Sequence, residues 1–173
     1  MRALAASLIL SAAPALAQQA PENPPEPTLD TAMIDACLVA QAGEDGDQHA
    51  CAGQAADACM NAPGVYSTAG MSWCLDAELA HWDGLLNTAY VALMDRAKAT
   101  DTEMKELGSA APAEAPRLRD MQRTWIAFRD AACTYEASRW GGGTGAGPAS
   151  LQCALDLTAR QYLLLDAYLG AGD

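Results

Sequence analysis

Three segments of the chain carry apolar side chains at the spacing of an amphipathic helix. The three apolar stripes are Leu75, Leu79, Trp82, Leu86, Ala89 and Leu93; Leu118, Met121, Trp125, Phe128, Ala132 and Tyr135; and Leu151, Leu155, Thr158, Tyr162, Leu165 and Leu169. Steps of three and four residues place the members of each stripe on one face of a helix. Three such helices can bury their stripes against one another. The pattern therefore predicts an all-α protein built as a small antiparallel helical bundle.

An alanine-rich segment, residues 29–62, precedes these stripes. It has two blocks of helix-like composition, 28–42 and 48–61, and it contains none of the ten aromatic residues, which all lie between Tyr66 and Tyr168. Breaks rich in Gly and Pro at 43–47, 61–70, 108–116 and 141–148 separate the expected helices. We therefore expect a helical hairpin over 29–62, which needs disulfides for stability, followed by a helical domain over 63–170.

The six cysteines allow fifteen pairings. If consecutive cysteines pair, the midpoints of the three links fall near residues 44, 66 and 143, and each midpoint lies in a predicted loop. Residues equidistant from the turn face one another in a helical hairpin, so this scheme staples each hairpin once. The favoured pairs are Cys37–Cys51, Cys59–Cys74 and Cys133–Cys153.

The N-terminal residues have the composition of an export signal. Residues 1–17 combine Arg2, an apolar run and small residues, which predicts a signal peptide cleaved after Ala17. The proline-rich residues 18–28 predict an extended tether. No cysteine for lipid attachment follows the apolar run, and no other segment approaches the roughly 20 apolar residues of a membrane span. We expect a periplasmic or secreted protein, in an oxidising compartment suited to disulfides.

The chain is strongly acidic, with a formal net charge of −12. Removal of residues 1–17 deletes one charged residue, Arg2, and changes this value to −13. Such an excess argues against nucleic acid or an anionic membrane as a partner and permits attraction to a basic protein. Solubility alone is an equally direct explanation of the charge.

The sequence offers no catalytic constellation. "GGGTGAGPAS" lacks the Lys-Ser/Thr pair of a phosphate-binding loop, and it follows a helix and precedes one that we expect to start near Ala149. His49 and His81 are the only histidines, and no metal-binding spacing is present. The carboxylates most suited to acid/base chemistry are assigned to exposed helix faces: Asp76, Glu78, Asp83, Glu106 and Glu136. We therefore predict neither an enzyme nor a cofactor or metal site.

The run "RDMQRTWIAFRDAACTYE" places Gln122, Trp125, Arg129 and Asp130 at helical spacing. We interpret these residues as structural. Trp125 and Phe128 are expected to fill the core, while Arg129 and Asp130 tie neighbouring helices together through hydrogen bonds.

Several motifs occur in an order that points to one family. They are a cysteine followed by "TAGMSWC", then "LNTAYVAL", "MQRTWIAFRDAAC", "GGGTG", a further cysteine and "LTARQ". From Cys59 to Leu169 the chain resembles the LprI-type lysozyme-inhibitor N-terminal domain family, most clearly in Q-x-x-W-x-x-x-R-D-x-x-C. The resemblance implies a small, helical, disulfide-bonded exported domain. For at least one member it also implies inhibition of lysozyme, a cationic muramidase that attacks peptidoglycan. This chain departs from the pattern in lacking a lipid-attachment cysteine and in adding the Cys37–Cys51 hairpin.

These observations lead to one functional hypothesis and one alternative. The hypothesis is a periplasmic protein that binds and inhibits a basic, lysozyme-type muramidase through the loop clamped by Cys133 and Cys153. The expected contact residues are Tyr135, Glu136, Trp140 and Thr144. The two aromatics serve as anchors and the glutamate meets basic groups, unless the aromatics instead pack beneath the loop. The alternative is an envelope interaction or structural module that inhibits nothing.

Overall fold

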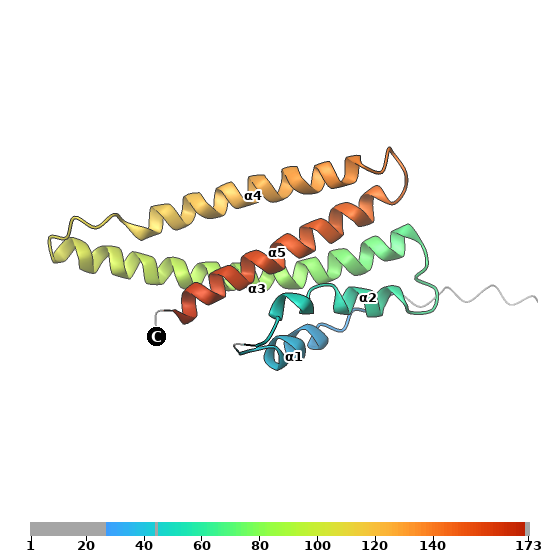
Figure 1. Cartoon of the computed structure of the whole chain (residues 1–173), viewed down its shortest axis with the longest axis horizontal. Coiled ribbons are helices and arrows are strands. Elements are labelled where there is room, and N and C mark those ends of the chain that lie inside the picture. The colour runs from blue at the N-terminus through green and yellow to red at the C-terminus, as the bar shows by residue number, and fades with distance from the viewer. Residues whose placement is uncertain (1–26, 44, 172–173) are drawn as a thin grey trace, which may run out of the picture.

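The computed structural model describes residues 27–43 and 45–171, and every regular element in these residues is helical (Figure 1). The elements are α1 (Ala32–Ala40), the 3-10 helix η1 (Gln48–Cys51), α2 (Gln54–Met60), α3 (Thr68–Glu106), α4 (Glu114–Ser138) and α5 (Ala146–Gly170). The prediction of an all-α bundle is confirmed. The expected signal peptide, residues 1–17, and all of the tether except residues 27 and 28 lie outside the described residues.

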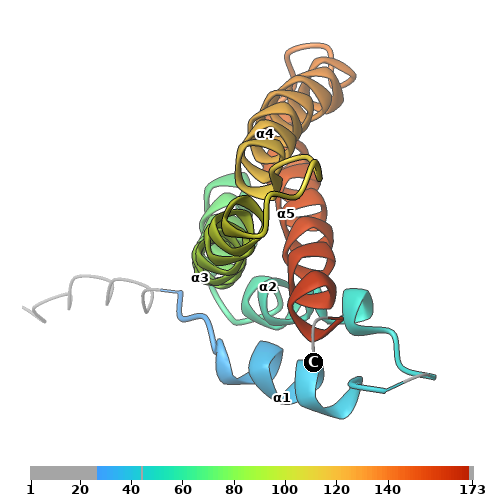
Figure 2. The ribbon, with the colours of Figure 1, turned by 90° about the vertical axis from the view of Figure 1, so that its left-hand side faces the viewer.

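The three long helices form the bundle and the short ones cover one side of it. α4 runs back along the bundle, and α5 turns again and packs along both α3 and α4. α2 packs on α3, and η1 packs on α5. The views of Figures 1 and 2 agree that α1 and α2 lie on the side of the bundle away from α4. α3 and α5 are therefore covered from two sides.

Two long helices begin earlier than their prolines suggested. Pro116 and Pro148 each occupy the third position of their helix, because α4 begins at Glu114 and α5 at Ala146. Proline is tolerated in a first turn, where its missing N–H has no intrahelical partner. The prediction that the last helix starts near Ala149 was therefore wrong by about one turn.

The expected helix over 48–61 is interrupted. Ala52 is extended, and Gly53 has a φ of +93°, so the chain leaves η1 and starts again as α2. A left-handed backbone is available to glycine without steric cost. The first short helix is also shorter than the predicted block 28–42, since α1 covers Ala32–Ala40.

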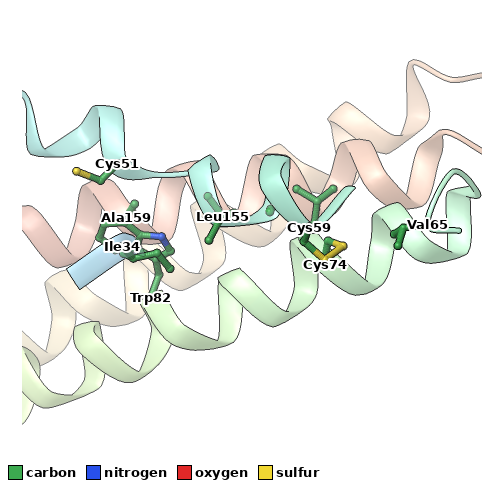
Figure 3. Close-up of a cluster of buried hydrophobic side chains, with 11 residues drawn as sticks. Ile34, Cys51, Cys59, Val65, Cys74, Trp82, Leu155 and Ala159 are labelled. Atoms are coloured by element: carbon green, nitrogen blue, oxygen red, sulfur yellow. A yellow bond between two sulfur atoms is a disulfide. The ribbon is translucent and has the colours of Figure 1, made fainter. Parts of the chain in front are cut away.

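The largest cluster of buried side chains joins the N-terminal segment to the bundle (Figure 3). Ile34 of α1, Trp82 of α3 and Ala159 of α5 are all fully buried in it. The Trp82 ring also lies 5.8 Å from that of Tyr162, centroid to centroid. The alanine-rich helices bring few large side chains, and they form this core together with side chains of α3 and α5.

A second cluster lies between the long helices. Leu86 and Leu165 are buried in it, and Met121 and Trp125 of α4 pack against it. Phe128 does not take part, since 59% of its surface is exposed. The expectation that Phe128 fills the core was wrong. A polar groove lined by Asp76 and Arg129, among others, separates this part of α4 from α3.

The three disulfides have the consecutive pairing that the loop positions favoured. Cys37–Cys51 joins α1 to η1, Cys59–Cys74 joins α2 to α3, and Cys133–Cys153 joins α4 to α5. No cysteine of the chain is left free. A disulfide therefore closes each of the three turns, between α1 and η1, between α2 and α3, and between α4 and α5.

Glu78 of α3 is the main departure from the predicted surface. It was expected on an exposed helix face, yet its side chain is fully buried. Its Oε1 accepts hydrogen bonds from the Gly53 backbone N–H (2.7 Å) and the Trp82 indole N–H (3.0 Å). Its Oε2 accepts one from the Ala56 N–H (2.6 Å). One carboxylate thus satisfies two free donors at the start of α2, where a negative charge also suits the helix dipole.

α3 caps two further helices in the same manner. Asp101 accepts hydrogen bonds from the backbone N–H groups of Glu114 (2.6 Å) and Ala115 (3.0 Å), the first two residues of α4. Arg96 donates to the carbonyl oxygens of Tyr168 and Leu169 (2.8 Å to Leu169) at the end of α5. Acidic side chains therefore meet helix N-termini and a basic one meets a C-terminus, as the helix dipole favours.

The Asp101 cap gives a stability prediction. Replacing Asp101 by alanine removes both acceptors from the start of α4, and we expect the free energy of unfolding to fall by about 1 kcal/mol. Urea denaturation followed by circular dichroism measures this change. Glu103→Ala on the same helix is the control, because Glu103 is exposed and its side chain has no hydrogen bond in the structure. Equal losses in the two variants would contradict a capping role.

Candidate partner-binding site

The corner between α4 and α5 is held by one disulfide and a tight turn. Cys133 and Cys153 link the two helices, with Cα atoms 5.4 Å apart. Gly141 and Gly142 have φ angles of +57° and +83°, which let the chain reverse within a few residues. The Gly143 N–H donates to the Trp140 carbonyl (2.9 Å), and the Trp140 ring lies against Gly145, where a Cβ would meet it at 2.3 Å. A backbone hydrogen bond and the contact between the Trp140 ring and Gly145 therefore hold the turn in one conformation.

The four predicted contact residues all lie at this corner, but in two pairs. Tyr135 and Glu136 line a groove between α4 and α5 of about 670 Å³, which we call the α4–α5 groove. Trp140 and Thr144 line a smaller groove of about 400 Å³ on the other side of α5, the loop groove. Ala149 borders both grooves. The two grooves are therefore neighbours separated by the start of α5.

The two aromatic residues among the predicted contacts, Tyr135 and Trp140, are exposed and do not belong to the core. Tyr135 is 69% exposed and Trp140 is 51% exposed, although Trp140 rests partly on Gly145. Packing beneath the loop, the alternative for these two rings, does not hold for Tyr135, whereas the Trp140 ring does lie against Gly145 of the loop. Thr144 is exposed and Glu136 is half-buried. Large exposed aromatic side chains beside a groove are typical of protein-binding surfaces.

Sequence reasoning missed other residues that line these grooves. Phe128 and Leu157 face the α4–α5 groove, and Met71 faces the loop groove. Phe128 was assigned to the core because it falls on the apolar stripe of its helix. The stripe continues through Phe128 to Tyr135, and its spacing alone does not show which of its members are buried.

Charges at the rim of the α4–α5 groove are largely paired. Glu136 binds Arg139 (2.9 Å), and this hydrogen bond raises the pKa of Arg139. Asp156 binds Arg160 (3.0 Å), and its Oδ1 lies 2.9 Å from Nε2 of His49 on η1. Both acidic residues that line this groove, Glu136 and Asp156, are therefore neutralised by a neighbouring arginine.

The negative charge is concentrated in the N-terminal part of the sequence. Residues 3–95 contain no Lys or Arg, whereas residues 96–173 are close to neutral. Asp30, Asp45, Asp47 and Asp57 of this N-terminal part are exposed. Asp35, also exposed, lies 3.1 Å from His81 Nε2. The acidic excess therefore lies in the N-terminal half of the sequence.

The motif residues of α4 make contacts within α4 and with α5. Gln122 is buried, and its Oε1 accepts a hydrogen bond from Gln161 of α5 (3.0 Å). Arg129 donates twice to Asp130 (3.0 and 2.9 Å) and lies 5.0 Å from the centre of the Trp125 ring. The prediction that Arg129 and Asp130 tie neighbouring helices was wrong, because they are adjacent in α4 and bind one another. Gln122 makes the link between helices.

The chain is similar in sequence to a bacterial protein and to a family model. Among the described residues, no helix has the length and apolar character of a membrane span. The chain is 28% identical over 130 residues to an "Uncharacterized 17.7 kDa protein in puhA 5'region" of Rhodobacter capsulatus, covering 75% of this chain and 80% of that protein. No solved structure matches the chain. A family model described as lysozyme inhibitor LprI matches residues 59–165. Since this match spans more than half of the chain, the protein belongs to the LprI lysozyme inhibitor family.

Proposed function

We propose that this protein binds and inhibits a lysozyme-type muramidase, using the clamped corner between α4 and α5 as its contact surface. Membership of the LprI family carries the proposal, since it suggests a lysozyme inhibitor rather than an enzyme. The same membership and the three disulfides suggest an exported, envelope-associated protein. We place it in the periplasm or outside the cell, after cleavage behind Ala17.

The shape of the corner supports this use. Tyr135 and Phe128 border the α4–α5 groove and are both more than half exposed. Cys133, two residues before Tyr135, fixes the end of α4 against α5. Rigid aromatic side chains give a large contact area at a low entropic cost, and they are frequent among residues that dominate binding energy. A partner would insert apolar side chains between Tyr135 and Leu157.

The distribution of charge supports a basic partner. The net charge of the chain is −12, and its negative charge is concentrated in residues 3–95. Such a charge attracts a cationic enzyme at distances beyond those of direct contact. Such steering raises the association rate at low ionic strength and weakens as salt screens the charges. Inhibition of a basic muramidase should therefore be faster at low salt than at physiological salt.

The activity test is a titration of the purified, oxidised protein against hen-type lysozyme clearing a cell-wall suspension. We expect inhibition, and we expect Tyr135→Ala to weaken it by about tenfold or more because the variant removes an exposed anchor. Ile126→Ala is the matched control, since Ile126 is an exposed apolar residue of the same helix that borders neither groove. Circular dichroism of both variants checks that the fold is kept.

The other outcomes separate the alternatives. If a large molar excess leaves clearing unchanged at both low and physiological salt, inhibition of this lysozyme class is wrong. The alternative of a non-inhibitory envelope module then gains support, and a periplasmic pull-down tests it. Cell-wall digestion by the protein itself would instead show an enzyme.

A further inference from the structure

A cavity lies at the far end of the bundle from the clamped corner, where α5 ends before its neighbours do. α5 stops at Gly170, near Arg96, whereas α3 continues to Glu106 and connects there to α4 (Figure 1). The cavity between the three helices measures about 530 Å³. This volume lies within the range of small-molecule binding sites.

The floor of this cavity is apolar. Leu93 and Ala97 of α3 face Leu118 and Met121 of α4, and Tyr168 of α5 forms one side. Leu93 and Ala97 are mostly buried, while Leu118 and Met121 are half-buried. Because α5 ends at Gly170, before it covers these side chains, they offer a surface on which a hydrocarbon chain is removed from water.

The rim of the cavity is basic, in contrast to the rest of the chain. Arg96 and Arg117 border it, and Glu114 is the single acidic residue in its lining. The lining therefore has a formal charge of +1, while the whole chain carries −12 and residues 3–95 hold no Lys or Arg. An anionic group meets less repulsion here than at the N-terminal side of the molecule.

Both arginine side chains are held by backbone carbonyl oxygens and still have free N–H donors. Arg96 is half-buried and held by the Tyr168 and Leu169 carbonyls. Arg117 donates one bond to the Ala113 carbonyl (2.7 Å). A guanidinium has five N–H donors in a planar fork, so each retains donors that fit a carboxylate. A planar anionic head group and an apolar chain thus find complementary groups in one cavity.

We propose that this cavity binds a single-chain fatty acid. Its carboxylate is held by Arg96 and Arg117, and its acyl chain lies on Leu93, Leu118 and Met121. One chain suits the volume, and a carboxylate suits guanidinium groups that line the same cavity. The site is separate from the clamped corner, so it does not depend on lysozyme binding.

The test titrates the full-length, oxidised protein with dodecanoate by isothermal calorimetry, below the concentration at which dodecanoate forms micelles. One-to-one binding is expected, with a shift of the Met121 methyl signal in carbon-edited NMR spectra. Dodecyltrimethylammonium has the same chain with a positive head group and should bind about tenfold more weakly or not at all. Arg117→Glu should weaken dodecanoate binding by about tenfold.

Arg119→Glu is the matched control, because Arg119 is exposed on the same helix but does not line the cavity. This variant should bind dodecanoate as the parent does. Equal binding of the two amphiphiles, or equal weakening by the two substitutions, would overturn the proposal. So would a Met121 signal that stays unchanged while heat is released. Binding of an acidic apolar peptide in place of dodecanoate would show that the occupant is a protein segment instead.

Discussion

Replacing Glu78 by glutamine is expected to lower the free energy of unfolding by about 3 kcal/mol. The buried carboxylate accepts hydrogen bonds from Gly53, Ala56 and the Trp82 indole, and no basic side chain contacts it. Glutamine has nearly the same size, but it offers one oxygen and directs an NH₂ group at a donor. At least one N–H at the start of α2 then loses its acceptor in a place that water does not reach.

Asp76→Asn serves as the control for this substitution. Asp76 is exposed, two residues earlier on α3, and undergoes the same chemical change. Urea denaturation of the oxidised proteins gives both free energies. If Glu78→Gln and Asp76→Asn unfold at the same urea concentration, the Glu78 carboxylate is not required as a charged acceptor. A large loss confined to Glu78→Gln shows that α2 is held to the bundle by this group.

Helical periodicity predicted the long helices because their apolar faces repeat locally. Leu75, Trp82 and Leu86 share one face of α3 whatever packs against it, so three-and-four spacing identifies the face without a partner. The cysteine pairing was predictable for a similar reason. Positions equidistant from a turn meet in any helical hairpin, and Cys133 and Cys153 meet in this one.

Contacts between distant residues could not be predicted in this way. Glu78 looks like a surface glutamate in its own helix, because its two backbone donors lie 25 and 22 residues earlier, at Gly53 and Ala56. The pairing of Gln122 with Gln161 likewise spans 39 residues. Whether a stripe residue is buried also depends on its neighbours, and so Phe128, which periodicity assigns to the core, lies on a groove. The candidate site was therefore located by its loop, while its extent required the packing of α4 on α5.

Removal of the corner disulfide is expected to cost about 3 kcal/mol in the double variant Cys133→Ala/Cys153→Ala. The link closes a chain separation of 20 residues, so its loss frees the unfolded chain and favours unfolding. Urea denaturation measures the loss. Hydrogen exchange should show the fastest opening around Gly141–Thr144, because Gln122–Gln161 and the core at Leu86 still hold the other end of α4.

The same variant decides whether rigidity of the corner matters for binding. Cys37→Ala/Cys51→Ala is the control, since that disulfide closes a separation of 14 residues between α1 and η1 and does not link α4 to α5. If a fixed α4–α5 groove is needed, lysozyme inhibition weakens in the corner variant and persists in the control at temperatures where both are folded. Inhibition that survives the loss of Cys133–Cys153 would show that the aromatic side chains act without the clamp, and that the disulfide serves stability alone.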